Sequence, residues 1–249
     1  MKALVTFVLL ALPLSVMAQE KDSSHLKTGS YMSLLVYKTR SLTELNRQLQ
    51  VAGHAPLVEA LIGLTLGTTH RFADQNSYGA SRASWLIASD DAQDERRSTT
   101  LMVWELAGFG YYDLLPHPNW LAYPSLGFGA SYGRLVVSAI EPSGTFQNSL
   151  NALGDEEVVQ KKYGTQGLML FGELGVGLER MWALRGSDLY LGLGSGYRLS
   201  TQQPWVLKGV KSYGDTFSTQ GWTFELKVRL EAHPVKDQQV SRGLFKYFK

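Results

Sequence analysis

The sequence contains no cysteine, which excludes disulfide bonds, thiolate chemistry and a lipid anchor on a cysteine side chain. Net charge is also nearly absent, because 24 Lys and Arg face 22 Asp and Glu, so there is no electrostatic case for binding nucleic acid. Beyond the N-terminus no run of about 18 apolar residues occurs, so no helix of the mature chain is expected to span a bilayer. The five histidines show no metal-ligand spacing, and we expect neither a metal site nor a cofactor.

The first residues are typical of a secretory signal peptide. Lys2 supplies a positive start, the apolar run "ALVTFVLLALPLSV" follows, and Val16 and Ala18 are small residues before Gln19. We therefore expect a cleaved signal peptide at 1–18 and one domain at 19–249. Within that domain we expect a barrel over roughly 30–233 and a C-terminal tail at 234–249.

Glycine and aromatic residues are abundant, with 25 Gly and a total of 28 Trp, Tyr and Phe, a mixture that favours curved β-structure. One helix is predicted at 41–52, where Ser41 and Glu44 have the spacing of a capping box and Leu42, Leu45 and Leu49 share a face. Nearly everything else is predicted to be strand, in the segments 30–39, 57–73, 78–91, 98–113, 120–140, 164–183, 187–201 and 217–233.

Strict alternation is clearest in "WTFELKVRL" (222–230), where apolar side chains alternate with Thr223, Glu225, Lys227 and Arg229. Successive side chains of a strand point to opposite faces, so this segment has one apolar and one charged face. In 168–182 and 188–199 the same alternation places glycines on the face that carries the charges. Glycine there relieves crowding inside a small closed barrel.

The predicted connections alternate in length. Short ones contain "ADQNSYG", "LLPHPN" and "ALRGS". The longer ones contain the helix, "DDAQDERRS", residues 141–163 and about 202–216. Short turns at one end and long loops at the other, with both termini at the turn side, are typical of an outer-membrane barrel. The pattern predicts an all-β, eight-stranded antiparallel up-and-down transmembrane β-barrel with one short helix in a connection. We also expect interfacial aromatic girdles, formed by Tyr111, Tyr112, Trp120, Tyr123, Trp182, Trp205 and Trp222.

Two segments resemble small outer-membrane β-barrel proteins of Gram-negative bacteria, of the porin-like or OmpA-like type. They are "LNRQLQVAGHAPL" (45–57) and "YPSLGFG" (123–129). The resemblance covers most of the mature chain. It implies an outer-membrane location, outer-membrane lipid as surroundings and the barrel-assembly machinery as insertion partner, and it implies no catalytic residues.

Charged residues of both signs fall on the face that cannot meet lipid, because a charge near the bilayer centre costs about 2–4 kcal/mol. They are expected to form a lumen charge network: Glu105, Glu173, Glu179, Arg198, Glu225, Lys227, Arg229 and Glu231. We favour a lumen plugged by paired charges; the alternative is a narrow conduit in which the same charges select ions.

The predicted function is therefore an integral outer-membrane protein with a structural, surface-interaction or narrow-pore role. Two alternatives are a lipid-modifying outer-membrane enzyme and a secreted lipocalin-like ligand-binding barrel. No enzyme is expected, because "GLGSGY" (192–197) lacks the strand-turn-helix context of a nucleophile elbow and no Ser and His share a face two residues apart. His70 is expected at a strand end, where it could face the lumen.

Overall fold

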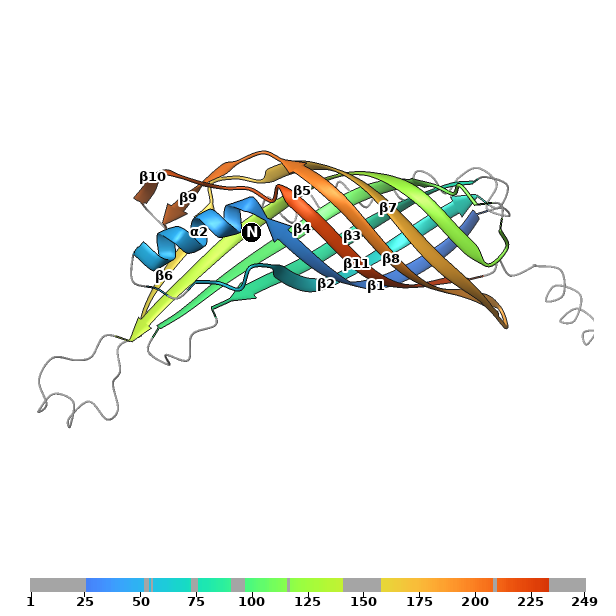
Figure 1. Cartoon of the computed structure of the whole chain (residues 1–249), viewed down its shortest axis with the longest axis horizontal. Helices are drawn as coiled ribbons and strands as arrows, with labels where there is room; N and C mark the ends of the chain where they lie inside the picture. The colour runs from blue at the N-terminus through green and yellow to red at the C-terminus, as the bar shows by residue number, and fades with distance from the viewer. Residues whose placement is uncertain are drawn as a thin grey trace, which may run out of the picture.

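Eight long strands form the body of the molecule in the computed structural model, which describes residues 26–51, 54, 56–72, 76–90, 97–115, 117–140, 158–207 and 210–232 (Figure 1). They pair antiparallel in chain order, and the last returns to the first, which closes the sheet. This confirms the predicted eight-stranded antiparallel barrel. The eight strands are β1(Leu26–Thr39), β2(Leu61–Phe72), β3(Ser77–Ser89), β4(Arg97–Tyr112), β5(Trp120–Ile140), β7(Met169–Leu184), β8(Ser187–Ser200) and β11(Gly221–Ala232).

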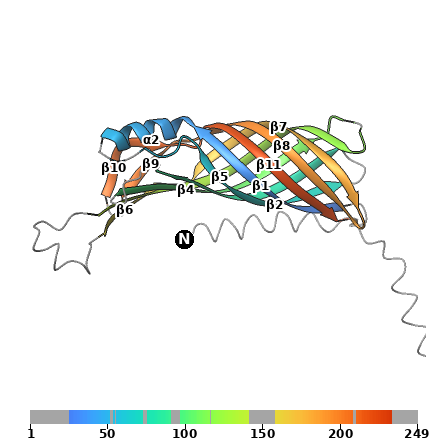
Figure 2. The same ribbon diagram turned by 60° about the horizontal axis from the view of Figure 1, so that its bottom comes forward.

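The two ends of the barrel differ. At one end, here called the turn end, short connections join β2 to β3, β4 to β5 and β7 to β8, and the described chain starts and stops there. The β7–β8 turn holds Gly186 at φ 87°, in the left-handed region that glycine adopts without strain. The opposite end, here called the head end, carries helix α2(Arg40–Val51) and strands β6(Val158–Thr165), β9(Gln203–Leu207) and β10(Val210–Phe217) (Figure 2).

The three head strands correct part of the sequence analysis, which treated 141–163 and about 202–216 as connections. Strand β5 pairs with β7 as far as Ser131 and with β6 from Arg134 onward, while β6 pairs with β9 and β9 with β10. The sheet therefore continues beyond the closed barrel on one side. The predicted strand 164–183 was also wrong at its start, since β6 ends at Thr165 and β7 begins at Met169.

Arg134 lies in phase with the apolar side chains Phe128 and Tyr132 on the outward face of β5. The β4–β5 register is unbroken from Arg97↔Ala139 to Tyr111↔Ser125, so there is no bulge between these two strands. Arg134 instead lies just past the point at which β5 exchanges β7 for β6. Strand β7 begins at Met169, opposite Ser131, so Arg134 lies outside the closed barrel and beyond its apolar belt.

Helix α2 has the predicted buried face but a different cap. Leu42, Leu45 and Leu49 are buried, whereas the helix begins at Arg40 and the Ser41 amide donates to Thr39 Oγ1 at 3.3 Å. Thr39 therefore occupies the capping position, because a side-chain oxygen there accepts one of the free amides of the first turn. The predicted Ser41–Glu44 capping box is wrong. The Ser41 hydroxyl lies 3.0 Å from that of Ser218 and accepts from the Ser218 amide at 3.1 Å.

Glu44 instead accepts two hydrogen bonds from the exposed Arg47 guanidinium, and this contact lowers the pKa of its carboxyl.

The leucine face of α2 covers the head strands. It belongs to an apolar cluster that fills the head end of the barrel and includes Tyr37, Leu61, Leu101, Met169, Trp205 and Phe217. None of the helices in the described residues is long and apolar enough to cross a membrane.

The outside of the barrel is an apolar belt. Along β11 the exposed side chains alternate with buried polar ones, as predicted for 222–230. Leu226 lies at its centre, paired with Leu34 of β1 and Leu193 of β8, and all three are exposed. Other exposed members come from β2, β3, β5 and β7 and include Leu64, Leu66, Ile87, Leu126, Phe128, Leu170, Leu174, Val176 and Leu178. Leu106 of β4 lies on the same outer face.

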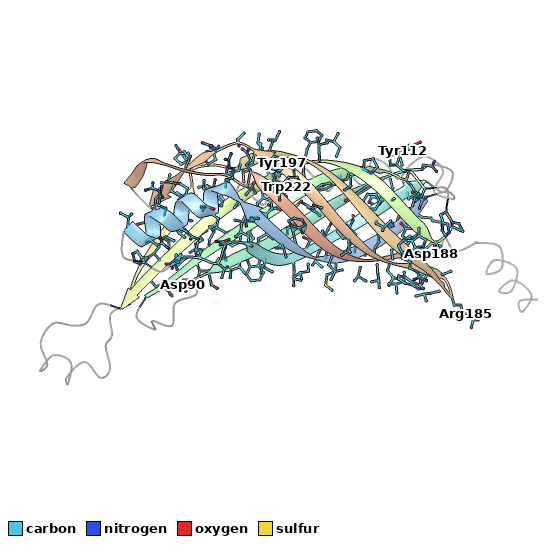
Figure 3. All side chains as sticks on the ribbon, viewed as in Figure 1. Asp90, Tyr112, Arg185, Asp188, Tyr197 and Trp222 are labelled. Carbon is cyan, nitrogen blue, oxygen red and sulfur yellow. The ribbon has the colours of Figure 1, made fainter. Side chains whose placement is uncertain are left out.

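Aromatic side chains flank the belt toward both the head end and the turn end, although not all of the predicted residues do. Tyr197 and Trp222 contact each other toward the head end at a ring-centroid distance of 5.1 Å, and Tyr112 lies at the turn end (Figure 3). Trp120 and Trp182 also face outward at the turn end, on either side of Arg180. For Tyr111, Tyr123 and Trp205 the prediction was wrong, since all three are buried inside.

Candidate functional site

The lumen of the barrel is the candidate site, because it gathers the charged side chains of strands far apart in sequence. The structure places seven of the eight predicted lumen residues in buried positions, and Glu225 is half-buried. They form two clusters, one toward the head end and one toward the turn end. The first contains Glu105, Glu173 and Arg198, and the second contains Glu179, Glu225, Lys227, Arg229 and Glu231.

Arg198 of β8 is the centre of the first cluster and is fully buried. Its guanidinium donates to both carboxylate oxygens of Glu105 on β4, and to Glu173 Oε2 on β7 at 2.7 and 3.0 Å. Glu173 also accepts from Arg82 Nη2 at 3.2 Å and from the Thr223 hydroxyl at 3.2 Å. The cluster thus joins five strands across the lumen. Glu105 accepts a bidentate contact from Arg198, and Glu173 is shared by Arg82 and Arg198 in charge-assisted hydrogen bonds.

Glu179 of β7 is the centre of the second cluster. It accepts from Arg229 Nη2 at 2.6 Å, from the Tyr123 hydroxyl at 2.6 Å and from Lys227 Nζ at 3.3 Å. Arg229 also donates to Glu231, which accepts a further hydrogen bond from the Tyr190 hydroxyl at 3.0 Å. Both carboxylates are therefore neutralised and hydrogen-bonded, which is the condition for keeping an ion in a low-dielectric interior.

Glu225 and Lys227 lie on the side of the second cluster that faces the first. Glu225 Oε2 is 3.8 Å from Lys227 Nζ, and its other oxygen accepts from the Ser33 hydroxyl at 2.6 Å. A cavity of about 20 Å³ lies here, lined among others by Arg82, Glu173 and Lys227. That volume suits a single water molecule rather than a solute.

Aromatic rings cover the cations where carboxylates do not. The Arg198 guanidinium lies 3.7 Å from the Phe171 ring centroid, and that of Arg82 lies 4.2 Å from the centroid of Phe109. Glycines of β5 make room for these rings. A Cβ on Gly127 would come within 2.2 Å of the Phe109 ring, and one on Gly129 within 2.5 Å of Phe171. The glycines of "YPSLGFG" thus have a packing role, because each leaves space for a ring that covers an arginine.

Arg82 is the site residue that the sequence analysis missed. It is buried, it faces the lumen from β3 and it contacts Glu173. A signal was present in the sequence, since Arg82 has the opposite parity to Trp85 and Ile87, which lie on the exposed face. The same rule that placed Arg198 inside would have placed Arg82 inside.

Apolar and aromatic layers lie on both sides of the charges. Toward the head end lies the cluster covered by α2, and toward the turn end lies a second one with Tyr31, Tyr78, Phe109, Tyr111, Tyr123 and Tyr190. In the second layer the rings of Tyr78 and Tyr111 stack at 4.6 Å. Beyond it, near the turn end, Lys27 pairs with Asp188 at 3.6 Å and Arg71 with Asp113 at 3.7 Å.

The histidines take no part in these clusters as far as the structure describes them. His70 lies on the outward face of β2, in phase with the exposed Leu66, so the suggestion that it could face the lumen was wrong. His117 is exposed in the β4–β5 turn and accepts from the Asn119 amide at 3.1 Å. Among the described residues no group of three or more His, Asp or Glu is arranged to hold a metal. His25 and His233 lie outside the described residues.

Ser195, the central residue of "GLGSGY", lies in the middle of β8 and pairs with Val176 and Phe224. It therefore sits on a regular strand and not on a sharp strand-to-helix turn. Closed antiparallel pairing, an exposed apolar belt and charged side chains inside are together typical of outer-membrane barrels. The chain has the fold of a small outer-membrane β-barrel.

Comparisons with solved structures find bacterial outer-membrane barrels. Neisserial surface protein A is 10% identical over 85% of this chain and 98% of that chain, with a TM-score of 0.38. Ail, the attachment invasion locus protein of Yersinia pestis, is 9% identical over 85% and 99%, with a TM-score of 0.36. A major outer membrane protein from Thermus thermophilus is 14% identical over 83% and 98%, with a TM-score of 0.40. Searches against protein-family models and curated proteins give no match.

Proposed function

We propose that this protein is an integral outer-membrane barrel with a closed, non-conducting lumen, and that it serves to hold its helix-covered head at the cell surface as an interaction module. The observation that carries the proposal is the pair of ion clusters across the lumen. They contain five glutamates and four basic side chains, and hydroxyls of β1 and β5 complete their contacts.

The apolar belt supports the membrane placement. On the outward face of β5, Trp120 and Tyr132 lie twelve residues apart, one at each edge of the belt. At about 3.3 Å per residue and a strand tilt of about 35–45°, their separation along the barrel axis is about 30 Å. This matches the hydrocarbon core of a bilayer, which is about 30 Å thick. The turn end then faces the periplasm and the head faces outward, as short turns do in such barrels.

Desolvated pairs support a closed lumen. Arg198, Glu105, Glu179 and Arg229 are all buried and bound to one another or to a hydroxyl. An open path for ions would require these partners to separate, and removing one partner from a buried ion pair costs about 3–5 kcal/mol. The narrow conduit is the second candidate, because charges of both signs line the position where a filter would lie.

Export through the signal peptide at 1–18 and insertion by the barrel-assembly machinery complete the proposal. We also propose a non-enzymatic role. The lumen carboxylates are all committed to cations or hydroxyls, and Ser195 has no histidine beside it among the described residues.

Single-channel recording in a planar bilayer tests the closed lumen. The wild-type protein, refolded and shown to be heat-modifiable on a gel, is expected to give no discrete conductance steps. The double variant Glu173→Ala with Arg198→Ala removes one charge of each sign and two large side chains from the first cluster, and it should introduce a leak. Steady, ion-selective steps from the wild-type protein would establish the narrow conduit instead. A leak equal in both proteins would show that the first cluster does not seal the lumen.

A further inference from the structure

The outer wall has a pocket beside the belt, at the place where the sheet changes strands. It has a volume of about 360 Å³ and is lined by β5, β6 and β9, with Tyr132, Arg134, Lys162, Gly164 and Val206 among its lining residues. The pocket lies where β5 has exchanged β7 for β6, so its wall belongs to the head and not to the closed barrel.

Its height relative to the membrane follows from the strand register. Trp85, Trp104 and Tyr132 lie side by side on β3, β4 and β5, and the rings of Trp104 and Tyr132 are 6.1 Å apart. This row lies at the head side of the apolar belt, with Ile87 one step beyond it on β3. Arg134 is the next residue of β5 on the same face. Lys162 of β6 pairs with Val136 of β5 and therefore lies one step further out. Each step is about 7 Å along the strand, so both cations lie in the headgroup region just above the belt.

Unlike the cations of the lumen, the two cations of the pocket are accessible to a ligand. Arg134 is half-exposed and Lys162 is exposed, and neither forms an ion pair or a side-chain hydrogen bond with any residue that the structure describes. The lumen cations Arg198, Arg229 and Lys227 are all paired with glutamates. Two neighbouring cations that have no acidic partner in the described part of the chain favour an anionic ligand from outside.

The floor of the pocket is shaped by Gly164. A Cβ at this position would come within 2.3 Å of the Tyr132 hydroxyl oxygen, so the absent side chain lets the Tyr132 ring lie over β6. The result is an aromatic floor at belt level with an arginine and a lysine above it. Below the floor the exposed Phe128 and Leu170 continue the apolar belt toward the membrane centre.

We propose that this pocket binds the phosphate group of an anionic lipid in the adjoining leaflet, with the acyl chains of the lipid against Phe128 and Leu170. The proposal rests on the membrane placement proposed above. Arg134 supplies the planar fork that holds two phosphate oxygens, and Lys162 adds a point charge. The continuous apolar surface below the pocket selects a lipid over free phosphate, because it gives the chains of the same molecule a place to lie.

The test is native mass spectrometry of the refolded protein in detergent, titrated with diphosphoryl lipid A, with the same lipid lacking its phosphates, and with inorganic phosphate as competitor. The test variant is Arg134→Gln with Lys162→Gln. The matched control is Lys38→Gln with Arg40→Gln on the opposite wall, where Lys38 pairs in register with the belt residue Trp222. Both variants lose two positive charges from the outer surface, but the control lies outside the pocket, where Lys38 contacts Glu59 at 3.7 Å.

We expect phosphorylated lipid A to bind the wild-type protein and the control alike. Each neutralised cation of the pocket should weaken binding of phosphorylated lipid A roughly fivefold, about twenty-five-fold for the pair. The lipid without phosphates should bind the wild-type protein no more tightly than phosphorylated lipid A binds the pocket variant. Equal weakening in the two variants would overturn the proposal in favour of general surface attraction. If millimolar inorganic phosphate displaced the lipid, the pocket would be a site for free phosphate, and the proposal that it binds a lipid would be overturned. Heat-modifiable mobility and lipid-vesicle insertion of all three proteins test the membrane placement separately.

Discussion

Lys227→Leu tests the paired lumen in the strand where the alternation of faces is clearest. Lys227 is 3% exposed, and its Nζ lies 3.2 Å from the Tyr123 hydroxyl, 3.3 Å from Glu179 and 3.8 Å from Glu225. It also faces the ring of Tyr111 at 5.0 Å. Leucine fills part of the space but leaves Glu225 with a single hydroxyl partner.

The expected loss is about 3 kcal/mol in the free energy of unfolding. Removing one partner of a buried ion pair costs about 3–5 kcal/mol, and the lower figure applies because Arg229 still neutralises Glu179. Urea titration of the protein in lipid vesicles, followed by tryptophan fluorescence, measures the change. Adding Glu225→Gln to Lys227→Leu should recover part of the loss, because it removes the carboxylate that lost its cation.

Lys38→Leu is the control on the outer wall, where the ion pair that Lys38 forms among the described residues is an exposed contact of 3.7 Å with Glu59. Its effect should stay within about 0.5 kcal/mol, as for most exposed pairs. If Lys227→Leu were equally mild, the lumen would be hydrated and open enough for Glu225 to be solvated. The closed lumen would then have to be abandoned.

Three further substitutions test the belt, the inner packing and the head. Leu226→Arg places a charge at the middle of the belt, where Leu226 is 52% exposed, and should cost about 2–4 kcal/mol and abolish heat-resistant mobility on gels; a neutral result would mean that this face meets water. Gly127→Val drives a side chain into a ring and should cost about 1–3 kcal/mol in the same urea titration, whereas Gly110→Val, with open space around it, should be nearly neutral. Asn46→Ala removes a 2.7 Å and a 2.8 Å hydrogen bond to the backbone of Leu57, so hydrogen exchange should rise in the head but not in the barrel.

Much of the barrel follows from the sequence because a strand repeats every two residues. Once Trp222 and Leu226 are placed on one face, Lys227 and Arg229 must lie on the other, and the structure places them inside. The same rule holds for Glu173 and Glu179 on β7. It would also have identified Arg82, and it distinguishes Tyr111, which is buried, from Tyr112, which is exposed. The position of an aromatic residue near a strand end carries no such information.

Only the tertiary structure decides which charges meet. Arg198 and Glu105 are 93 residues apart in the chain, and their contact depends on the register of every strand between them. The head strands depend on the fold in the same way, because β6, β9 and β10 are short and pair with one another only after β5 has left β7. The helix cap at Thr39 is set by the end of β1, which the local pattern at Ser41 and Glu44 does not show. Alternation along one strand fixes which face a residue occupies, whereas closure of the sheet fixes its neighbours across the lumen.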